Sequence, residues 1–260
     1  MKTIIIADIH QRVENVKTIL DREKNADEFI FLGDWFDSFH NPPKVTSFRE
    51  TCAFLRELVL NKKYYQQKLT FCVGNHDLSY IYRNNRPSAT SVHNTPEYYC
   101  SGVTSSKVNT FRKEFFDKGL NDKFFLRNFQ IAYQSQGWTF SHAGVIPQHL
   151  PYGGNLKDFV EKDCVDAFNC FRQLRNYPKN YILSDVGECR GGWAQFGGLL
   201  WLDYSREFYA SSDIGKQVFG HSRGTDCRVT AEETDYESWC LDDEKSYGII
   251  ENGKLLIKLI

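Results

Sequence analysis

The sequence contains no long hydrophobic run. None of its apolar stretches approaches the about 20 residues that a membrane-spanning helix needs. The chain opens with Met1-Lys-Thr-Ile-Ile-Ile and soon reaches the polar residues Asp8 and His10, without the small-residue cleavage site of a signal peptide. We therefore expect a cytoplasmic protein with no membrane association.

Paired cysteines are also missing. The eight cysteines include no C-x-x-C pair and lie scattered at Cys52, Cys72, Cys100, Cys164, Cys170, Cys189, Cys227 and Cys240. Disulfide frameworks and zinc knuckles both depend on recurrent short separations, so this spacing disfavours them. We expect reduced thiols, most of them structural.

Neither sign of charge predominates. Lys and Arg number 32, Asp and Glu number 33, and the two groups are interleaved along the chain, which gives a net charge of -1. A dedicated nucleic-acid binder usually carries a basic stripe, so this pattern argues against one but leaves a nucleic-acid substrate open. A length of 260 residues fits one domain over 1–260, and nothing in the sequence indicates an oligomeric state.

What the sequence does contain is a series of short apolar segments typical of buried strands. Five of them lie at Lys2–Ala7, Glu28–Leu32, Leu69–Val73, Gly137–Phe140 and Gln217–Phe219. Helical periodicity occurs at Arg12–Glu23, Phe48–Leu60, Asn109–Lys118 and Leu156–Leu174. The chain therefore begins β-α-β-α-β, which predicts an α/β protein.

Further strands are expected in the second half of the chain. Alternating hydrophobicity predicts one at Phe124–Gln134. Four more are expected at Cys227–Thr230, Tyr236–Leu241, Ser246–Ile250 and Lys254–Ile260, with Asn252-Gly253 as the turn between the last two.

Two polar stretches, 83–106 and 176–198, lack any periodicity. Long irregular segments within a compact domain are commonly lids or binding loops. Because 83–106 follows soon after the string Gly74-Asn75-His76-Asp77, we expect it to form a lid.

Metal-type ligands follow five of the apolar segments. They are Asp8 and His10 after the first, Asp34 after the second, Asn75 to Asp77 after the third, His142 after the fourth and His221 after the fifth. Any one of them alone is more often a hydrogen-bonded loop or core residue. Because the carboxyl ends of strands in an open α/β sheet face one crevice, together they indicate a bimetallic centre.

In this order the residues resemble the calcineurin-like metallophosphoesterase superfamily, whose motifs are D-x-H, G-D-x-x-D, G-N-H-D/E, a later His and G-H-x-H. The match runs from Asp8 to Ser222. The strings Ser141-His142-Ala143-Gly144, Leu199-Leu200-Trp201 and Val218-Phe219-Gly220-His221 are similar to the serine/threonine phosphoprotein phosphatase branch and its bacterial and phage relatives. The resemblance implies an α/β (α+β) fold, a four-layer αββα sandwich of two mixed sheets flanked by helices.

The resemblance also implies a phosphoesterase whose nucleophile is a metal-bridging hydroxide. Asp8 and His10 would bind one metal and Asp34 would bridge, while Asn75, His142 and His221 would complete the second. These ligand types suit two divalent ions, Mn²⁺ first, with Fe or Zn²⁺ as alternatives. His76 resembles the family's general acid, which protonates the leaving oxygen, and Asp37 would orient it.

Three departures from the family pattern concern the substrate. The last motif ends in Ser222 rather than a second His, which the phosphoprotein phosphatase branch also lacks, so that water could occupy the position. Where that branch has Asp-Arg-Gly, this chain reads Asp37-Ser38-Phe39, and Gln11 replaces the Gly expected after D-x-H. The phosphate-holding Arg of that motif is therefore missing.

A phosphate clamp is still expected, because a guanidinium matches phosphate in shape and charge. The candidates are Arg12, Arg190, which lies beside the glycine cluster, and Arg223. His40 could also reach the site.

Three functions remain open. The first is hydrolysis of phosphate monoesters, on phosphoprotein or on a small phosphorylated metabolite. The second is a nucleotide phosphodiesterase or diphosphohydrolase, since Tyr98 and Tyr99 in the expected lid could stack a base. The third is a non-catalytic scaffold with this fold, against which the presence of His76 argues.

Overall fold

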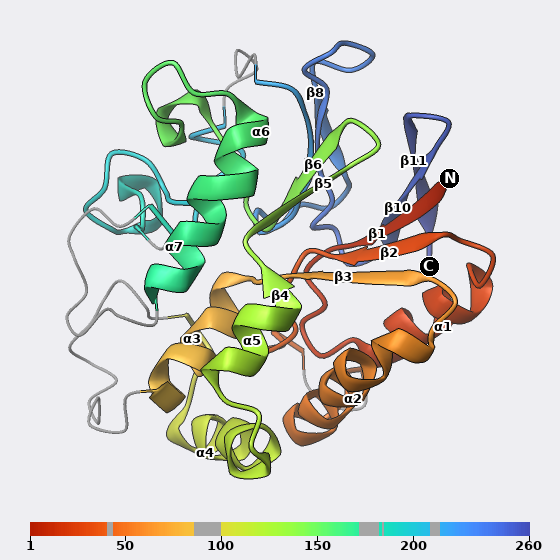
Figure 1. Cartoon of the computed structure of the whole chain (residues 1–260), viewed down its shortest axis with the longest axis vertical. Coiled ribbons are helices and arrows are strands. Elements are labelled where there is room, and N and C mark those ends of the chain that lie inside the picture. The colour runs from red at the N-terminus through yellow and green to blue at the C-terminus, as the bar shows by residue number, and fades with distance from the viewer. Residues whose placement is uncertain (41–43, 86–99, 172–181, 184, 209–213) are drawn as a thin grey trace.

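The structure is a computed structural model that describes residues 1–40, 44–85, 100–171, 182–183, 185–208 and 214–260 (Figure 1). Its first β-sheet has six strands in the order β11-β10-β1-β2-β3-β4. They are β1 (Lys2–Ile6), β2 (Glu28–Phe31), β3 (Lys68–Cys72), β4 (Phe129–Gln130), β10 (Ser246–Glu251) and β11 (Lys254–Leu259). β1 to β4 run parallel, whereas β10 and β11 are antiparallel, as expected for strands joined by the tight Asn252-Gly253 turn.

The second sheet has five strands in the order β5-β6-β7-β9-β8. They are β5 (Ala132–Ser135), β6 (Trp138–Ser141), β7 (Lys216–Phe219), β8 (Arg228–Thr230) and β9 (Ser238–Cys240). β6, β7 and β9 are parallel to one another, and β5 and β8 pair antiparallel at the edges. Both sheets are thus mixed, which confirms the expected fold class.

The two sheets pack face to face, because successive side chains of a strand point to opposite faces. Ile5 of β1 packs with Trp138 and Phe140 of the second sheet, whereas Ile4 and Ile6 face the helices. All five are buried. Each such side chain contributes about 1.5 to 3 kcal/mol when fully buried, so this double core holds the strand ends in place.

Helices cover the outer face of the first sheet. α1 (Val13–Arg22) and α2 (Phe48–Asn61) lie together below it in Figure 1, and their apolar residues join the cluster that contains Ile4. The start of α2 is fixed by a capping box, in which Ser47 and Glu50 satisfy each other's backbone N–H groups. In the described part of the chain, no helix is both long and apolar enough to cross a membrane.

The expected lid, 83–106, lies largely outside the described residues, because 86–99 are not described. Tyr98 and Tyr99 fall in that gap. The two ends of the segment 83–106 belong to α3 (Asn75–Asn85) and α4 (Ser105–Glu114) and are helical, whereas 100–104 are irregular as expected. α4 also begins four residues before the predicted Asn109, because the hydroxyl of Thr104 caps its first turn.

The predicted strand at 124–134 was wrong for its first half. Residues Asp122–Asn128 form helix α5, which Asn121 caps by accepting a hydrogen bond from the backbone N–H of Lys123. Phe125 and Phe129, four residues apart, pack with ring centroids 5.6 Å apart. The spacing of the aromatic residues in this segment is compatible with a helix as well as with a strand. The helix forms because Asn121 caps its first turn.

The predicted helix at 156–174 is interrupted. It consists of α6 (Leu156–Asp158), a π-helical turn at Phe159–Asp163 and α7 (Cys164–Phe171), and the residues after 171 lie outside the described part. The outer face of the second sheet packs against a different segment, in which Leu202 and Phe208 contact the cluster around Phe219 and Cys240. Seven cysteines of the described part are free thiols.

Candidate metal centre

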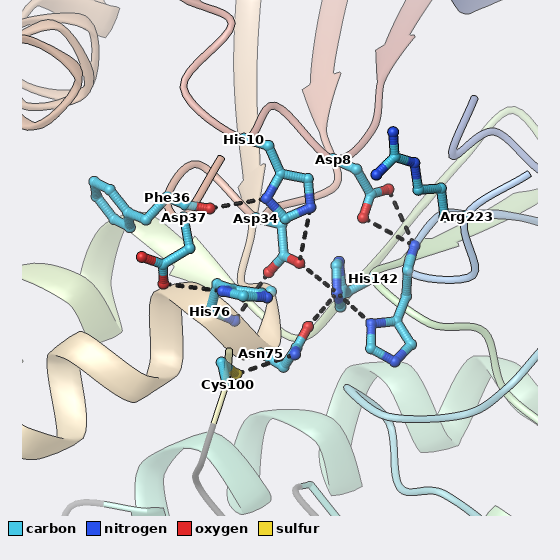
Figure 2. A network of polar contacts seen from close by, with 12 residues as sticks. Asp8, His10, Asp34, Phe36, Asp37, Asn75, His76, Cys100, His142 and Arg223 are labelled. Carbon is cyan, nitrogen blue, oxygen red and sulfur yellow. Dashed lines mark hydrogen bonds and ion pairs between the residues drawn. The ribbon is translucent and has the colours of Figure 1, made fainter. Parts of the chain in front are cut away.

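The residues singled out in the sequence converge at the carboxyl ends of five strands (Figure 2). They are Asp8 and His10 after β1, Asp34 after β2, Asn75 at the start of α3, His142 after β6 and His221 after β7. Both sheets contribute because β1 to β3 and β6 to β7 run parallel within their own sheets. The contributing strand ends of each sheet therefore meet at one edge of the sandwich.

Asp34 lies between two groups of candidate ligands. Its Oδ2 atom is 3.7 Å from Nε2 of His10 and 3.5 Å from Nε2 of His142. The ligand atoms of Asp8, His10 and Asp34 all lie within 4.8 Å of one another, and so do those of Asp34, His142 and His221. One carboxylate is thus shared by both groups, an arrangement suited to bridging a pair of cations.

The contact between His142 and Asn75 fits a site for a cation. Nδ1 of His142 donates to the carbonyl of Leu32 at 3.0 Å, and burial lowers the pKa of His142 to about 3, so Nε2 carries a lone pair. Nε2 faces Oδ1 of Asn75 at 2.8 Å, while Nδ2 of Asn75 donates to Sγ of Cys100 at 3.1 Å. Two acceptor atoms this close are stabilised by a cation that both can coordinate.

His10 is oriented in the same way. Its Nδ1 donates to the carbonyl of Phe36 at 2.8 Å, which leaves the lone pair of Nε2 directed toward Asp34. Burial, and after it the charges of nearby basic groups such as His76, hold the pKa of His10 well below its usual value, so this ring is neutral. In both His10 and His142 a backbone carbonyl therefore selects Nε2 as the nitrogen that could bind a metal.

The buried carboxylates of Asp8 and Asp34 would be stabilised by positive charge. Burial raises the pKa of Asp8 well above its usual value, and the nearby carboxylate of Asp242 raises it further. Burial raises the pKa of Asp34 in the same direction, with added repulsion from Asp77 and Asp8. Divalent cations would remove this penalty, so the residues present fit a pair of them.

Asp77, which the sequence placed in a motif but to which it gave no role, joins two strand ends. Its carboxylate accepts backbone N–H groups of Asp34 at 2.9 Å, Trp35 at 2.9 Å and Gly74 at 3.0 Å. A Cβ at Gly74 would lie 2.1 Å from Oδ1 of Asp34, so this close approach requires glycine. The segments after β2 and β3 are thereby held in contact.

Four candidate ligands have a left-handed backbone. The φ angles are 41° at Asp8, 41° at His10, 52° at Asp34 and 66° at His221. Few residues other than glycine adopt such angles, and they cluster at functional sites. Here they turn the chain sharply at the strand ends and direct the side chains inward.

His76 and Asp37 form a pair beside the ligands. Nδ1 of His76 lies 2.9 Å from Oδ2 of Asp37, and the rings of His76 and His10 are 5.2 Å apart. Burial opposes ionisation of Asp37, but hydrogen bonds from His76, Lys107 and Tyr80 outweigh it and lower the pKa of Asp37. An ionised Asp37 keeps the proton on Nδ1 of His76 and leaves Nε2 as the nitrogen that does not face Asp37.

The sequence did not point to Tyr80 or Lys107. Tyr80 Oη donates to Oδ1 of Asp37 at 2.6 Å, and Nζ of Lys107 lies 2.8 Å from the same atom. Lys107 is separated from Asp37 by 70 residues and lies on α4. No local pattern marks such a contact, so only the fold reveals it.

The three candidate arginines occupy different places. Arg12 is only 12% exposed, donates to the carbonyl of Asp8 and pairs with Glu244 at 3.1 Å, which indicates a supporting position. Arg223 is 50% exposed and pairs with Glu244 at 2.8 Å. His40 also pairs with Glu244, at 3.0 Å. Glu244 therefore contacts three basic side chains, those of Arg12, His40 and Arg223.

Arg190 lies near His221 and has different partners. Its guanidinium donates to Oγ of Ser222 at 3.0 Å and pairs with Asp203 at 3.0 Å. Burial, and then the charge of Arg190, hold the pKa of His221 well below its usual value. Ser222, at the position of the missing second His, also accepts the backbone N–H of Tyr204 at 2.8 Å.

Comparisons with known proteins concern the fold and the family of the chain. Two solved structures of cold-active protein tyrosine phosphatases, one of them from a psychrophilic Shewanella species, superpose with a TM-score of 0.57 at 16% identity. They cover 99% of this chain and 76% and 77% of their own, and this likeness concerns the fold. A search of curated proteins gave no match. The sequence matches the family model described as calcineurin-like phosphoesterase over residues 1–246, and the chain belongs to this family of metal-dependent hydrolases.

Proposed function

We propose that the chain hydrolyses phosphate monoesters, on a phosphoprotein or on a small phosphorylated metabolite. The observation that carries this proposal is the His76–Asp37 pair, which lies directly beside the carboxylate shared by the two ligand groups. The backbone N–H of His76 donates to Oδ1 of Asp34 at 3.0 Å, so the proposed acid and the proposed bridge are fixed relative to each other.

In this proposal Asp8 and His10 hold one cation, Asn75, His142 and His221 hold the other, and Asp34 serves both. The ligands are oxygen and imidazole nitrogen without thiolate, which favours Mn²⁺, with Fe or Zn²⁺ as alternatives. Two such ions would lower the pKa of a bound water, so that hydroxide is available to attack phosphorus, and would neutralise charge on the phosphoryl oxygens. The protein would position the two ions through His10 and His142, whose tautomers are fixed by hydrogen bonds to backbone carbonyls.

His76 acts on the leaving group. Asp37 holds Nδ1, so Nε2 of His76 donates its proton to the ester oxygen as the bond to phosphorus breaks. Tyr80 and Lys107 in turn hold the other oxygen of Asp37. A carboxylate fixed on both sides cannot rotate away, and the imidazole keeps its orientation.

Arg190 and Arg223 are the groups proposed to hold phosphate. Both remain partly exposed, at 23% and 50%, and both are close to His221 in the chain or in space, since Arg190 contacts Ser222 and Arg223 follows it. A monoester is doubly negative at neutral pH, whereas a diester carries one charge. Two guanidinium groups added to two cations therefore favour the monoester.

Metal-supplemented hydrolysis of p-nitrophenyl phosphate and bis(p-nitrophenyl) phosphate tests the proposal. We expect kcat/KM for the monoester to exceed that for the diester by at least tenfold, on the order of one added charge-assisted hydrogen bond. A preference for the diester would favour the phosphodiesterase alternative. Absence of both activities in protein with two bound metals would favour a scaffold.

A further inference from the structure

Phe39 stands exposed at the mouth of the metal centre. Its side chain is 55% exposed, yet its ring lies 5.3 Å from the ring of His10 and 6.3 Å from that of His76. Single exposed aromatic residues are common and need no explanation by themselves. This one borders both a proposed metal ligand and the proposed proton donor, where a leaving group has to pass.

Arg223 lies over the same ring. Its guanidinium carbon is 5.7 Å from the centroid of Phe39, and its Nη2 is held by Glu244 at 2.8 Å. Glu244 is also paired with Arg12 and His40, so the carboxylate that holds Arg223 is itself held by two other groups. Phe39 and Arg223 together present an aromatic face and a cation at the rim.

The backbone around Phe39 is held by residues that depart from the family pattern. The side chain of Gln11 accepts the backbone N–H of Ser38 at 3.1 Å and donates to the carbonyl of Thr46 at 2.8 Å. The hydroxyl of Ser38 accepts the N–H of His40 at 2.9 Å. The unusual Gln11 thus supports the unusual Ser38-Phe39, and the two departures form one local structure.

We propose that Phe39 is a specificity residue that favours aryl phosphate esters, such as phosphotyrosine, over alkyl esters. This inference rests on the proposed monoesterase function. The ring of an aryl leaving group is bonded directly to the ester oxygen, so it lies close to His76 and within reach of Phe39 and Arg223. Offset or edge-to-face aromatic contact stabilises such a group, and the guanidinium adds to the contact. A nucleobase is separated from the phosphate by a ribose and would reach past this position.

The test compares phenyl phosphate with cyclohexyl phosphate, which has a ring of similar size without π electrons. In Phe39→Leu we expect kcat/KM for phenyl phosphate to fall roughly 3- to 10-fold, the scale of one aromatic contact. For cyclohexyl phosphate the change should stay within about twofold of wild type, because Leu keeps the apolar contact. Peptides of one sequence carrying phosphotyrosine or phosphoserine should show the same contrast.

Tyr64→Leu is the matched control, because Tyr64 is a 74% exposed aromatic next to Lys63 and belongs to the turn after α2. It should alter neither substrate. Equal loss on both substrates in Phe39→Leu, or no loss on either, overturns the inference while leaving the monoesterase proposal intact. Selective loss on 5′-AMP with phenyl phosphate unaffected overturns it in favour of a nucleobase. A metal-containing wild type inactive on every monoester overturns the monoesterase proposal itself, and the inference with it.

Discussion

The amide nitrogen of Asn75 donates a hydrogen bond to the sulfur of Cys100 at 3.1 Å. Ser79 donates to the same sulfur at 3.2 Å, and Cys100 is buried. The contact determines which end of the Asn75 amide faces His142. An amide that rotated would present N–H groups to a cation instead of an oxygen lone pair, so in the proposed centre Cys100 would support Asn75 as a ligand without touching the metal.

Replacing Cys100 with Val should therefore weaken the second metal site. We expect its affinity to fall about 10- to 100-fold, as is typical when a partner of a metal ligand is removed, while the first ion is retained. Cys100→Ser keeps an acceptor and should lose less. Titration with buffered Mn²⁺ measures both sites, and Cys52→Val, which changes a buried free thiol on α2, is the control. Unchanged affinity for both ions in Cys100→Val would show that Asn75 is oriented by other contacts.

Asp34→Asn should abolish turnover and lower the metal content. One carboxylate is shared by both groups of ligand atoms, and an amide bridges cations poorly. Elemental analysis of purified protein, together with p-nitrophenyl phosphate hydrolysis, measures both effects. Two bound ions per chain with a near-native rate would remove the proposed bridge.

His76→Ala should affect substrates according to how much their leaving oxygen needs a proton. For a phosphoserine peptide the loss in kcat should be on the order of 10² to 10⁴, because an alkoxide leaves poorly without protonation. For p-nitrophenyl phosphate the loss should be much smaller, and the metal content should hold. Asp37→Asn should follow the same pattern more mildly, since the imidazole remains but is less well oriented.

Equal losses of kcat on both substrates in His76→Ala, with metals retained, would contradict the acid role. That result would instead place His76 against the phosphoryl oxygens. Steady-state kinetics on the two substrates with the same enzyme preparation distinguishes these outcomes.

Ser222→Ala should leave the metal content unchanged but raise KM roughly 3- to 10-fold. The hydroxyl holds the guanidinium of Arg190, and a hydrogen bond to a charged group contributes about 1.5 to 3 kcal/mol, part of which the pair with Asp203 retains. Ser205→Ala is the control, because Ser205 accepts from Arg228 in a similar but exposed contact. A loss of metal in Ser222→Ala would make the serine a ligand.

The sequence was most informative where a polar residue directly follows an apolar strand. Asp8, Asp34 and His221 could be singled out because each follows an apolar strand, and parallel strands bring such ends together. Contacts such as Lys107 with Asp37 join distant segments, so nothing local marks them. The failure at Phe125 has a different cause, because its aromatic run fitted two periodicities and only the cap at Asn121 favoured the helix.

The left-handed backbone at Asp8, His10, Asp34 and His221 has a consequence for the evolution of the chain. Each non-glycine residue in this conformation costs about 1 kcal/mol or more, and a typical domain is stable by only roughly 5 to 15 kcal/mol. Replacing His221 with Gly would relieve part of that cost in the metal-free protein and should raise its melting temperature even as a ligand is lost. A lineage under selection for folding alone would drift toward such replacements. If the four residues bind metal as proposed, the metal-free fold is less stable because its ligands occupy these backbone positions.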